Sequence, residues 1–207
     1  MRCPACRTPA TEIDAACRQC GFSLEVAERS FGIPPSLQGP IADVAGVLGG
    51  FAARRAAREI AKVERRFPQL AMAVVLLEVP PQAPLAAYAF WLFNRSRLSS
   101  DVEKGGENRL VMLLIDISSD RAITMIGYGL EPLLHELHLQ TCLQAAEHPL
   151  QRGRYGPAIE SFMRELDRQL SEVYQLVPKQ FGLADDSQWL NASQPGDDTV
   201  DLAEHYY

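Results

Sequence analysis

The sequence lacks any apolar stretch of the roughly 18 to 20 residues that a membrane-spanning helix requires. The apolar segment that begins at Ala71 reaches only Val79 before Pro80-Pro81 ends it. The first residues, Met1-Arg2-Cys3-Pro4, also lack the apolar core of a secretory signal peptide. We therefore expect no transmembrane segment and a cytoplasmic location.

Positive charge is scarce as well. Lys and Arg number 20 against 26 Asp and Glu, which gives a formal net charge of −6 and argues against general nucleic-acid binding by the whole protein. A Gly-x-Ser-x-Gly motif is absent, which excludes hydrolases that carry their nucleophile on that turn. What is present, 47% hydrophobic residues in a chain of 207, suffices for one ordinary domain with a core and a small appendage.

Cysteine is sparse, with five residues, but four of them form two C-x-x-C pairs, Cys3 with Cys6 and Cys17 with Cys20. Each pair can place two thiolates on one side of a tight turn, as a tetrahedral zinc requires. Gly21 suits the position after the last ligand, where the backbone often needs a positive φ. The alternatives are two disulfides or two redox motifs, although a thioredoxin-type motif would need a surrounding βαβ unit. We predict a structural zinc ribbon over residues 1–24 that folds only with its metal.

The rest of the chain divides by its periodicity. Residues 25–49 show no clear pattern and many Gly and Pro, so we expect a linker that lets the ribbon move, with a short helix near Ile41–Leu48. Residues 50–180 carry a complete core pattern, and this domain is expected to fold without the ribbon. Residues 181–207 are rich in Asp, Ser, Gly and Asn, which is typical of a disordered acidic tail.

Two apolar runs predict the centre of a sheet. Leu110–Ile117 reads as a strand covered on both faces, and a polar turn then leads to a second strand, Ala122–Ile126. Ala71–Val79 is a third strand, connected to the first by a helix over Leu85–Phe93. Because a strand–helix–strand connection most simply joins parallel neighbours, we expect two parallel strands plus an antiparallel hairpin strand in an α/β fold.

Helices flank these strands. Phe51–Phe67 has a helical apolar stripe and a strongly basic opposite face, which could touch nucleic acid or acidic lipid but is better explained as a solvated face with ion pairs. After the hairpin we expect a helix beginning near Leu130, with Leu134 and Leu137 facing the core. A last helix runs from Tyr155 with a regular stripe.

Several motifs in these elements resemble the TPM domain family. They are Asn108 before the central strand, Gly127 and Gly129-Leu130-Glu131 after the hairpin, and Arg152-Gly153-x-Tyr155 at the start of the last helix. The resemblance spans most of residues 50–177 and implies an α/β/α sandwich around a small mixed sheet. It also implies acid phosphatase activity and calcium binding, as in some members, or assembly or repair of membrane complexes, as in others.

Three carboxylates are candidates for a calcium or magnesium site: Asp116, Asp120 and Glu131. In open α/β sheets ligands tend to bind at the carboxyl ends of parallel strands, where Asp116 lies, and hard cations prefer oxygen ligands. Such a site would support the alternative function, a metal-dependent acid phosphatase acting on phosphomonoesters. A turn aspartate and a helix N-terminal glutamate account for the same residues without a metal.

Other candidate groups are weaker. Glu131, His135 and His138 have a helical spacing that could bind zinc, but the neighbouring leucines claim the core-facing side, so the histidines are expected to face water. Cys142 has the character of a small core residue, and no nucleophile with an activating base is evident. The favoured hypothesis is therefore a non-catalytic module that binds a protein partner, with the zinc ribbon as a second contact surface.

Overall fold

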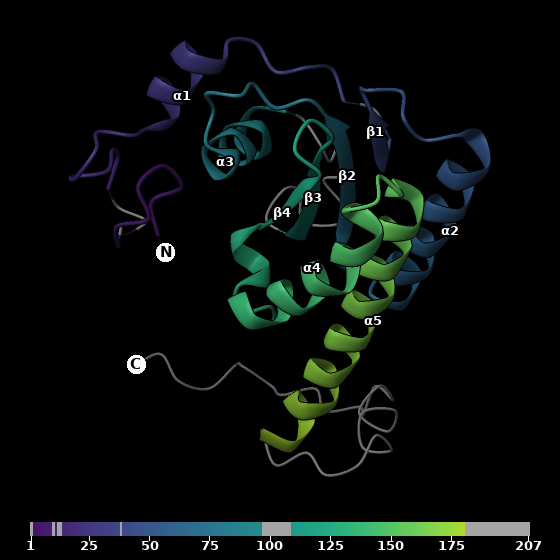
Figure 1. Cartoon of the computed structure of the whole chain (residues 1–207). Coiled ribbons are helices and arrows are strands. Elements are labelled where there is room, and N and C mark those ends of the chain that lie inside the picture. Colours follow the sequence, from purple (N-terminus) through teal and green to yellow (C-terminus); the bar gives the residue numbers. More distant parts are fainter. Residues whose placement is uncertain (1, 10, 12–13, 38, 97–108, 181–207) are drawn as a thin grey trace, which may run out of the picture. The chain divides into compact units, whose positions relative to one another are not determined.

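The computed structural model describes residues 2–9, 11, 14–37, 39–96 and 109–180. The predicted acidic tail at 181–207, and Asn108, lie outside the described residues. The chain falls into two units, Met1–Leu170 and Ser171–Tyr207, and the whole sheet belongs to the first. The elements succeed one another in this order (Figure 1): α1 (Leu24–Phe31), β1 (Ile41–Asp43), α2 (Gly50–Arg66), β2 (Ala71–Leu77), α3 (Leu85–Arg95), β3 (Leu110–Asp116), β4 (Arg121–Ile126), the 3-10 turn η3 (Tyr128–Leu130), α4 (Glu136–Leu150) and α5 (Tyr155–Gln180).

The four strands form one mixed sheet in the order β1-β2-β3-β4. β2 and β3 are parallel, in a register that runs from Ala71 opposite Leu110 to Leu77 opposite Asp116, and β4 is antiparallel to β3. Every residue of β2 and β3 is buried, which explains why both sequences are apolar runs, interrupted only by Asp116 at the end of β3, rather than alternating ones. The predicted pairing of these three strands is confirmed.

The sheet has one strand more than the sequence suggested. β1 pairs in parallel with β2, and the short helix expected over Ile41–Leu48 is wrong. The chain turns directly after β1, where the carboxylate of Asp43 accepts hydrogen bonds from the backbone N–H groups of Val47 and Leu48, at 3.1 and 2.7 Å. A strand of three residues is too short to display an alternating pattern.

A helix also lies within the expected linker. The hydroxyl of Ser23 accepts a hydrogen bond from the backbone N–H of Val26 and so caps α1. At the other end of α1, the Phe31 ring packs edge-on against Tyr88 and Trp91 of α3, with centroids 5.2 and 5.5 Å apart. Trp91, which lies off the apolar stripe of α3, is thereby covered and only 1% exposed.

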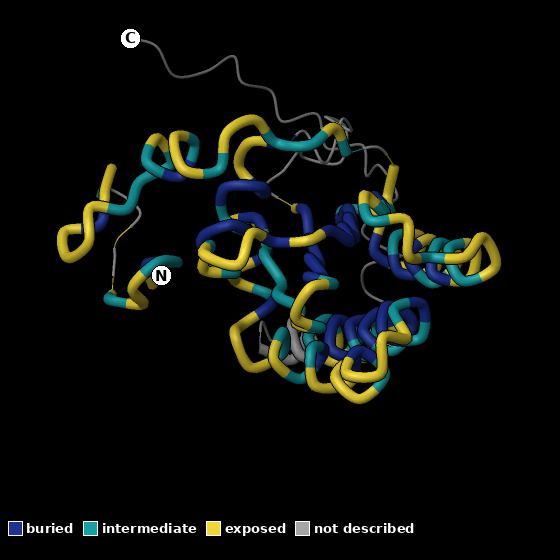
Figure 2. Tube along the Cα trace, turned by 45° about the horizontal axis from the view of Figure 1, so that its top comes forward, coloured by how far each residue is buried: buried dark blue, intermediate teal, exposed yellow. Residues whose placement is uncertain are grey.

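Helices cover both faces of the sheet, as the predicted α/β/α sandwich requires. On one face, α1 and α3 pack against alternate residues of β2 and β3 and against Ile123 and Met125 of β4. On the other face lie α2 and α4, together with the first part of α5 (Figure 1). The buried residues are concentrated between these layers (Figure 2).

The segment after the hairpin differs from the prediction. The helix begins at Glu136 rather than near Leu130, because Tyr128–Leu130 forms a 3-10 turn. Leu134 is buried as expected, but Leu137 is 74% exposed and does not face the core. The spacing of the leucines fitted one continuous helix. In the structure, Leu130 instead reaches the core from the 3-10 turn and Leu134 from the residues before α4.

Candidate metal centre and adjoining groove

The four paired cysteines gather at one point. Their sulfur atoms all lie within 4.8 Å of one another, with Cys3 Sγ 3.7 Å from Cys20 Sγ and Cys6 Sγ 3.7 Å from Cys17 Sγ. Sulfurs bound at about 2.3 Å to a tetrahedral ion are about 3.8 Å apart, so the cluster could hold a metal ion. A disulfide needs a sulfur separation of about 2.05 Å, and all five cysteines are free.

The two halves of the cluster are built alike. The backbone N–H of Arg7 donates to the carbonyl of Cys3 at 2.9 Å, and that of Gly21 donates to the carbonyl of Cys17 at 2.8 Å. Both donors have a left-handed backbone, with φ of 61° at Arg7 and 70° at Gly21. The sequence pointed to this conformation at Gly21, where glycine adopts it at little cost, but gave no such signal at Arg7.

The thiols of the cluster differ in acidity. Hydrogen bonds from the side chain and backbone of Thr8 lower the pKa of the Cys6 thiol to about 6. A backbone hydrogen bond from Phe22 favours the Cys20 thiolate, but desolvation and the contacts with the other thiols raise the pKa of Cys20 to about 12. A bound cation would favour the thiolate form of all four ligands, since only the thiolate binds metal.

The ribbon is anchored directly behind its last ligand. The backbone N–H of Cys17 donates to the carbonyl of Phe22 at 2.8 Å, and the Phe22 ring packs edge-on against Phe90 of α3, with centroids 5.9 Å apart. Ser23 then caps α1. The segment that was expected to let the ribbon move is therefore packed on the sheet domain.

Asp116, the first of the predicted carboxylate ligands, has its oxygens occupied by protein donors. Its Oδ1 accepts hydrogen bonds from the backbone N–H of Val79 and from the N–H and hydroxyl of Ser118, and its Oδ2 accepts one from the Ser119 hydroxyl. Burial alone raises the pKa of Asp116, but these hydrogen bonds outweigh it and lower the pKa below its usual value. Asp116 thus joins the ends of β2 and β3 to the following turn.

The structure does not bring Asp116, Asp120 and Glu131 together. Asp120 lies in the β3–β4 turn and accepts a hydrogen bond from the Tyr155 hydroxyl at 2.9 Å. Glu131 follows β4, whose end at Ile126 pairs with the start of β3 rather than with Asp116. Since a strand rises about 3.3 Å per residue, the six-residue β4 places Glu131 at the opposite end of the hairpin. Among the described residues, the group that gathers as a metal ligand set is the cysteine cluster.

The remaining candidates have structural roles. His135 is the N-cap residue of α4, and its backbone N–H donates to Nδ1 of His138 at 3.1 Å. Cys142 is completely buried, and burial raises the pKa of its thiol to about 12. A thiol with so high a pKa is a poor nucleophile at neutral pH.

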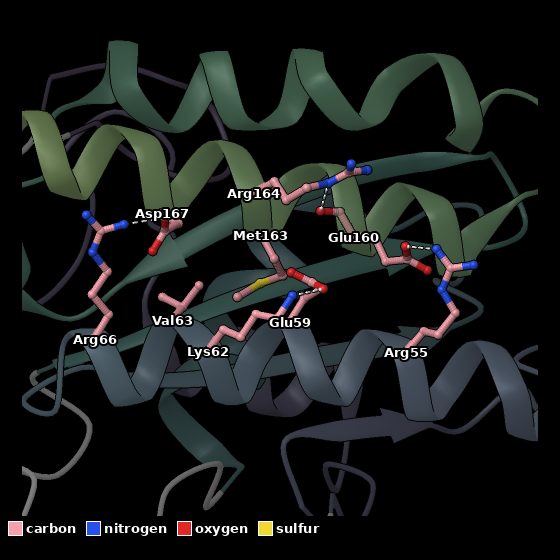
Figure 3. Close-up of a pocket in the computed structure, with 9 residues that line it drawn as sticks. All are labelled: Arg55, Glu59, Lys62, Val63, Arg66, Glu160, Met163, Arg164 and Asp167. Atoms are coloured by element: carbon pink, nitrogen blue, oxygen red, sulfur yellow. Dashed lines mark hydrogen bonds and ion pairs between the residues drawn. The ribbon is translucent and has the colours of Figure 1, made fainter.

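The basic face of α2 is paired across to α5. A cleft of about 610 Å³ lies between the two helices (Figure 3), and Arg55 bonds Glu160 at 2.5 Å while Arg66 bonds Asp167 at 2.7 Å. Lys62 pairs with Glu59 within α2, at 2.6 Å. The interpretation as a solvated, ion-paired face is supported, although most of the pairing is between helices rather than along one.

A second and larger hollow, about 840 Å³, runs along β4. We call it the β4 groove. It is bounded by β4, by the start of α3, by α4 and by the first cysteine turn of the ribbon. Its lining includes Pro4, Ala5 and Arg7 of the ribbon, Ala83–Ala86, Asp120–Thr124, and Leu139 and Leu143 of α4. The groove was not predicted from the sequence, although the position of the hairpin strand at the end of the sheet was a usable signal.

The described residues contain no helix long and apolar enough to cross a membrane.

Comparison with known proteins identifies relatives of the fold. A model of the TPM domain matches residues 41–169. A search of curated proteins finds no significant match. The N-terminal domain of a protein from P. gingivalis, solved by NMR, is similar with a TM-score of 0.51 at 20% identity, covering 64% of this chain and 82% of that one.

Two further NMR structures are similar. The N-terminal domain of the cg2496 protein from Corynebacterium glutamicum has a TM-score of 0.50 at 11% identity, covering 85% of this chain and 95% of that one. The BA42 protein from the psychrophilic bacterium Bizionia argentinensis has a TM-score of 0.50 at 10% identity, covering 61% and 83%. At these identities the likeness concerns the fold alone.

Proposed function

The chain belongs to the TPM domain family, and from this premise we propose that it is a non-catalytic interaction module whose sheet domain and zinc-loaded ribbon together bind a protein partner. The observation that carries the proposal is the β4 groove, because one hollow of about 840 Å³ is lined by both parts of the protein. Grooves lined by apolar side chains with a few polar groups are common binding sites.

Zinc is the metal that we assign to the four-cysteine cluster. Cys3, Cys6, Cys17 and Cys20 would hold it as four thiolates, a soft donor set that favours zinc over calcium or magnesium. Four protein ligands fill the tetrahedral coordination sphere and leave no position for a substrate, so the metal would be structural. The ion would fix the ribbon turn that forms one end of the β4 groove.

The contacts of the carboxylates favour this proposal over a metal-dependent phosphatase. A phosphatase of that kind needs carboxylate oxygens free to hold a cation against phosphate. Asp116 instead uses both oxygens to accept hydrogen bonds from Val79, Ser118 and Ser119. Asp120 accepts a hydrogen bond from the Tyr155 hydroxyl, and Glu131 lies at the far end of the hairpin.

A direct assay separates the two functions. The purified zinc-loaded chain is incubated with p-nitrophenyl phosphate and other phosphomonoesters, with and without calcium or magnesium, beside the Asp120→Asn variant. We expect no cation-dependent turnover in either protein. Asparagine tolerates the left-handed backbone of Asp120 (φ 49°), so we expect the variant to fold and any loss of turnover to report on the carboxylate. Turnover that depends on the cation and is lost in Asp120→Asn would contradict the proposal.

A second experiment addresses binding. A photo-crosslinking amino acid is placed at Gln144, an exposed residue of the α4 wall of the groove, or at Arg58, an exposed residue of α2 outside it. In the cells that produce the protein, we expect one discrete crosslinked partner from position 144 and none from position 58. Equal crosslinking at both positions, or at neither, would argue against a binding site in the groove.

A further inference from the structure

We infer that the β4 groove takes an extended, basic peptide that pairs with β4 and becomes the fifth strand of the sheet. This inference rests on the proposed interaction function and specifies its partner. β4 is the last strand in the order β1-β2-β3-β4, and among the described residues no strand pairs with its other side. Such an edge presents unpaired backbone donors and acceptors that an added strand can satisfy.

The register identifies the backbone groups that would pair. Gly127 N–H donates to the Leu110 carbonyl at 2.9 Å, and in an antiparallel ladder hydrogen-bonded pairs alternate with non-bonded ones. Counting back along β4 in the observed register, the residues whose N–H and C=O point away from β3 are Ala122, Thr124 and Ile126. These three residues offer the outer edge a donor and an acceptor each.

The walls of the groove set the side chains that would fit. Successive side chains of an added strand point to opposite faces. On one face they would meet Leu85 at the start of α3 beside Ile123, and on the other they would meet Leu139 and Leu143 of α4. The groove therefore accepts apolar side chains on both faces of an extended peptide, within a hollow of about 840 Å³.

Charge on the α4 wall selects basic peptides. The carboxylates of Glu136 and Glu147 line the groove, and their hydrogen-bond partners are the neutral amides of Gln140 and Gln151, at 3.3 and 3.0 Å. Neither negative charge is neutralised by these partners, so Lys or Arg on that face of the peptide would complement it.

A second copy of the chain fits the same edge less well. A two-fold interface brings identical surfaces together, so pairing of two β4 edges would bring the carboxylates of the α4 walls toward each other. The formal net charge of −6 on each chain adds to this repulsion. A basic peptide meets neither obstacle. Because Arg7 and Arg121 also line the groove, the basic residues of the peptide belong on the side of Glu136 and Glu147 of α4.

The test begins with a phage-displayed library of random linear peptides, selected against the full zinc-loaded chain. We expect selected sequences to alternate apolar residues with others and to contain Lys or Arg. Affinities of the synthetic peptides are then measured on the wild type and on two variants of one residue, Thr124→Pro and Thr124→Val. Proline removes an N–H that points away from β3, so the β3–β4 ladder is kept, while valine keeps the backbone and the shape.

The expected result is a peptide affinity that falls roughly tenfold or more in Thr124→Pro and changes little in Thr124→Val. Methylating those peptide nitrogens that would face β4 should weaken binding to the wild type similarly. This second measurement tests the strand pairing even if Thr124→Pro fails to fold.

Glu147→Gln should weaken the binding of basic peptides about threefold. In amide exchange by NMR, Ala122, Thr124 and Ile126 should exchange quickly in the free chain and slowly in the complex, whereas Ile123 and Met125 are slow in both.

Each contrary outcome overturns the inference. The inference fails if no peptide is selected or if the selected peptides are acidic. It also fails if peptides bind Thr124→Pro at full affinity and the methylated peptides bind the wild type at full affinity. The proposed interaction function is tested separately, by the crosslinking and phosphomonoester assays. Slow exchange at Ala122, Thr124 and Ile126 in a free monomer would show that the chain covers its own edge. A free dimer that Thr124→Pro dissociates would make the occupant a second copy.

Discussion

Replacing Asp116 by asparagine should lower the free energy of unfolding by about 2–3 kcal/mol. Four donors converge on this buried carboxylate, from Val79, Ser118 and Ser119. Hydrogen bonds to a charged acceptor stabilise by about 1.5–3 kcal/mol and neutral ones by about 0.5–1.5 kcal/mol. Asparagine keeps the shape, but its single oxygen accepts only neutral hydrogen bonds and its NH2 group, a donor, cannot accept the bond that the second carboxylate oxygen accepts. The saving from no longer burying a charge offsets part of this loss.

The pH dependence gives an independent check. Hydrogen bonds hold the pKa of Asp116 below its usual value in the folded protein, so the carboxylate stabilises the fold fully above its unfolded pKa of about 3.9. That contribution is lost as the pH falls through the folded pKa. The difference between wild type and Asp116→Asn should therefore be constant from about pH 5 to 7 and shrink below about pH 4.

The measurement is urea unfolding of the zinc-loaded proteins, followed by circular dichroism. With a slope of about 2 kcal/mol per molar urea, the expected loss of about 2–3 kcal/mol moves the midpoint by about 1–1.5 M. Ser30→Ala, on the exposed side of α1, serves as a control with little expected effect. Equal stability of wild type and Asp116→Asn would refute this account, and so would a difference that arises only when calcium is added, because Asp116 would then be a cation ligand.

Three further predictions concern the ribbon and its attachment. Elemental analysis should find one zinc per chain and none in Cys17→Ser, and an unchanged metal content would remove the ligand assignment. Gly21→Ala forces a side chain into a left-handed backbone (φ 70°) and should weaken zinc binding roughly five- to tenfold in a competition titration. Arg7→Gly places glycine in the matching left-handed position (φ 61°) and should not weaken binding, and equal weakening by both changes would show that backbone strain is not the cause. A chain shortened to begin at Ser23 should melt cooperatively in calorimetry, whereas one beginning at Gly50 loses α1 and β1 and should melt at a clearly lower temperature; equal melting temperatures would show that α1 is not part of the core.

The centre of the sheet could be predicted because its signals are long. β2 is a run of seven apolar residues, and β3 has six apolar residues before Asp116. The helix between the two strands indicated a parallel pairing. The cysteine cluster could likewise be predicted, because the C-x-x-C spacing of the paired cysteines is itself the signal. β1, with three residues, is too short to show a period. α1 carries a helical stripe of Leu24, Ala27 and Phe31, but over only eight residues, so the segment that contains both elements was interpreted as a linker.

The structure does not bring Asp116, Asp120 and Glu131 together, for a reason that was already present in the sequence. An antiparallel β4 must return the chain to the start of β3, so Glu131 could not share an edge with Asp116. Three of the four hydrogen bonds to Asp116 come from Ser118 and Ser119 in the turn that follows it, which is an ordinary turn pattern for aspartate. Only the bond from Val79 comes from a distant segment, and such a contact has no local signature. The β4 groove needs α3, α4 and the ribbon in their folded places, which no single stretch of sequence specifies.

The attachment of the ribbon has a consequence for protein turnover. Phe22 both closes the second cysteine turn, through its carbonyl, and packs on Phe90. A segment of about 20 residues has almost no core of its own, so a chain that has not acquired metal should release this contact and expose an unfolded, cleavable stretch next to an apolar surface. Proteases that survey newly made proteins would then remove unmetallated chains first, and the supply of metal would set how much of the protein persists.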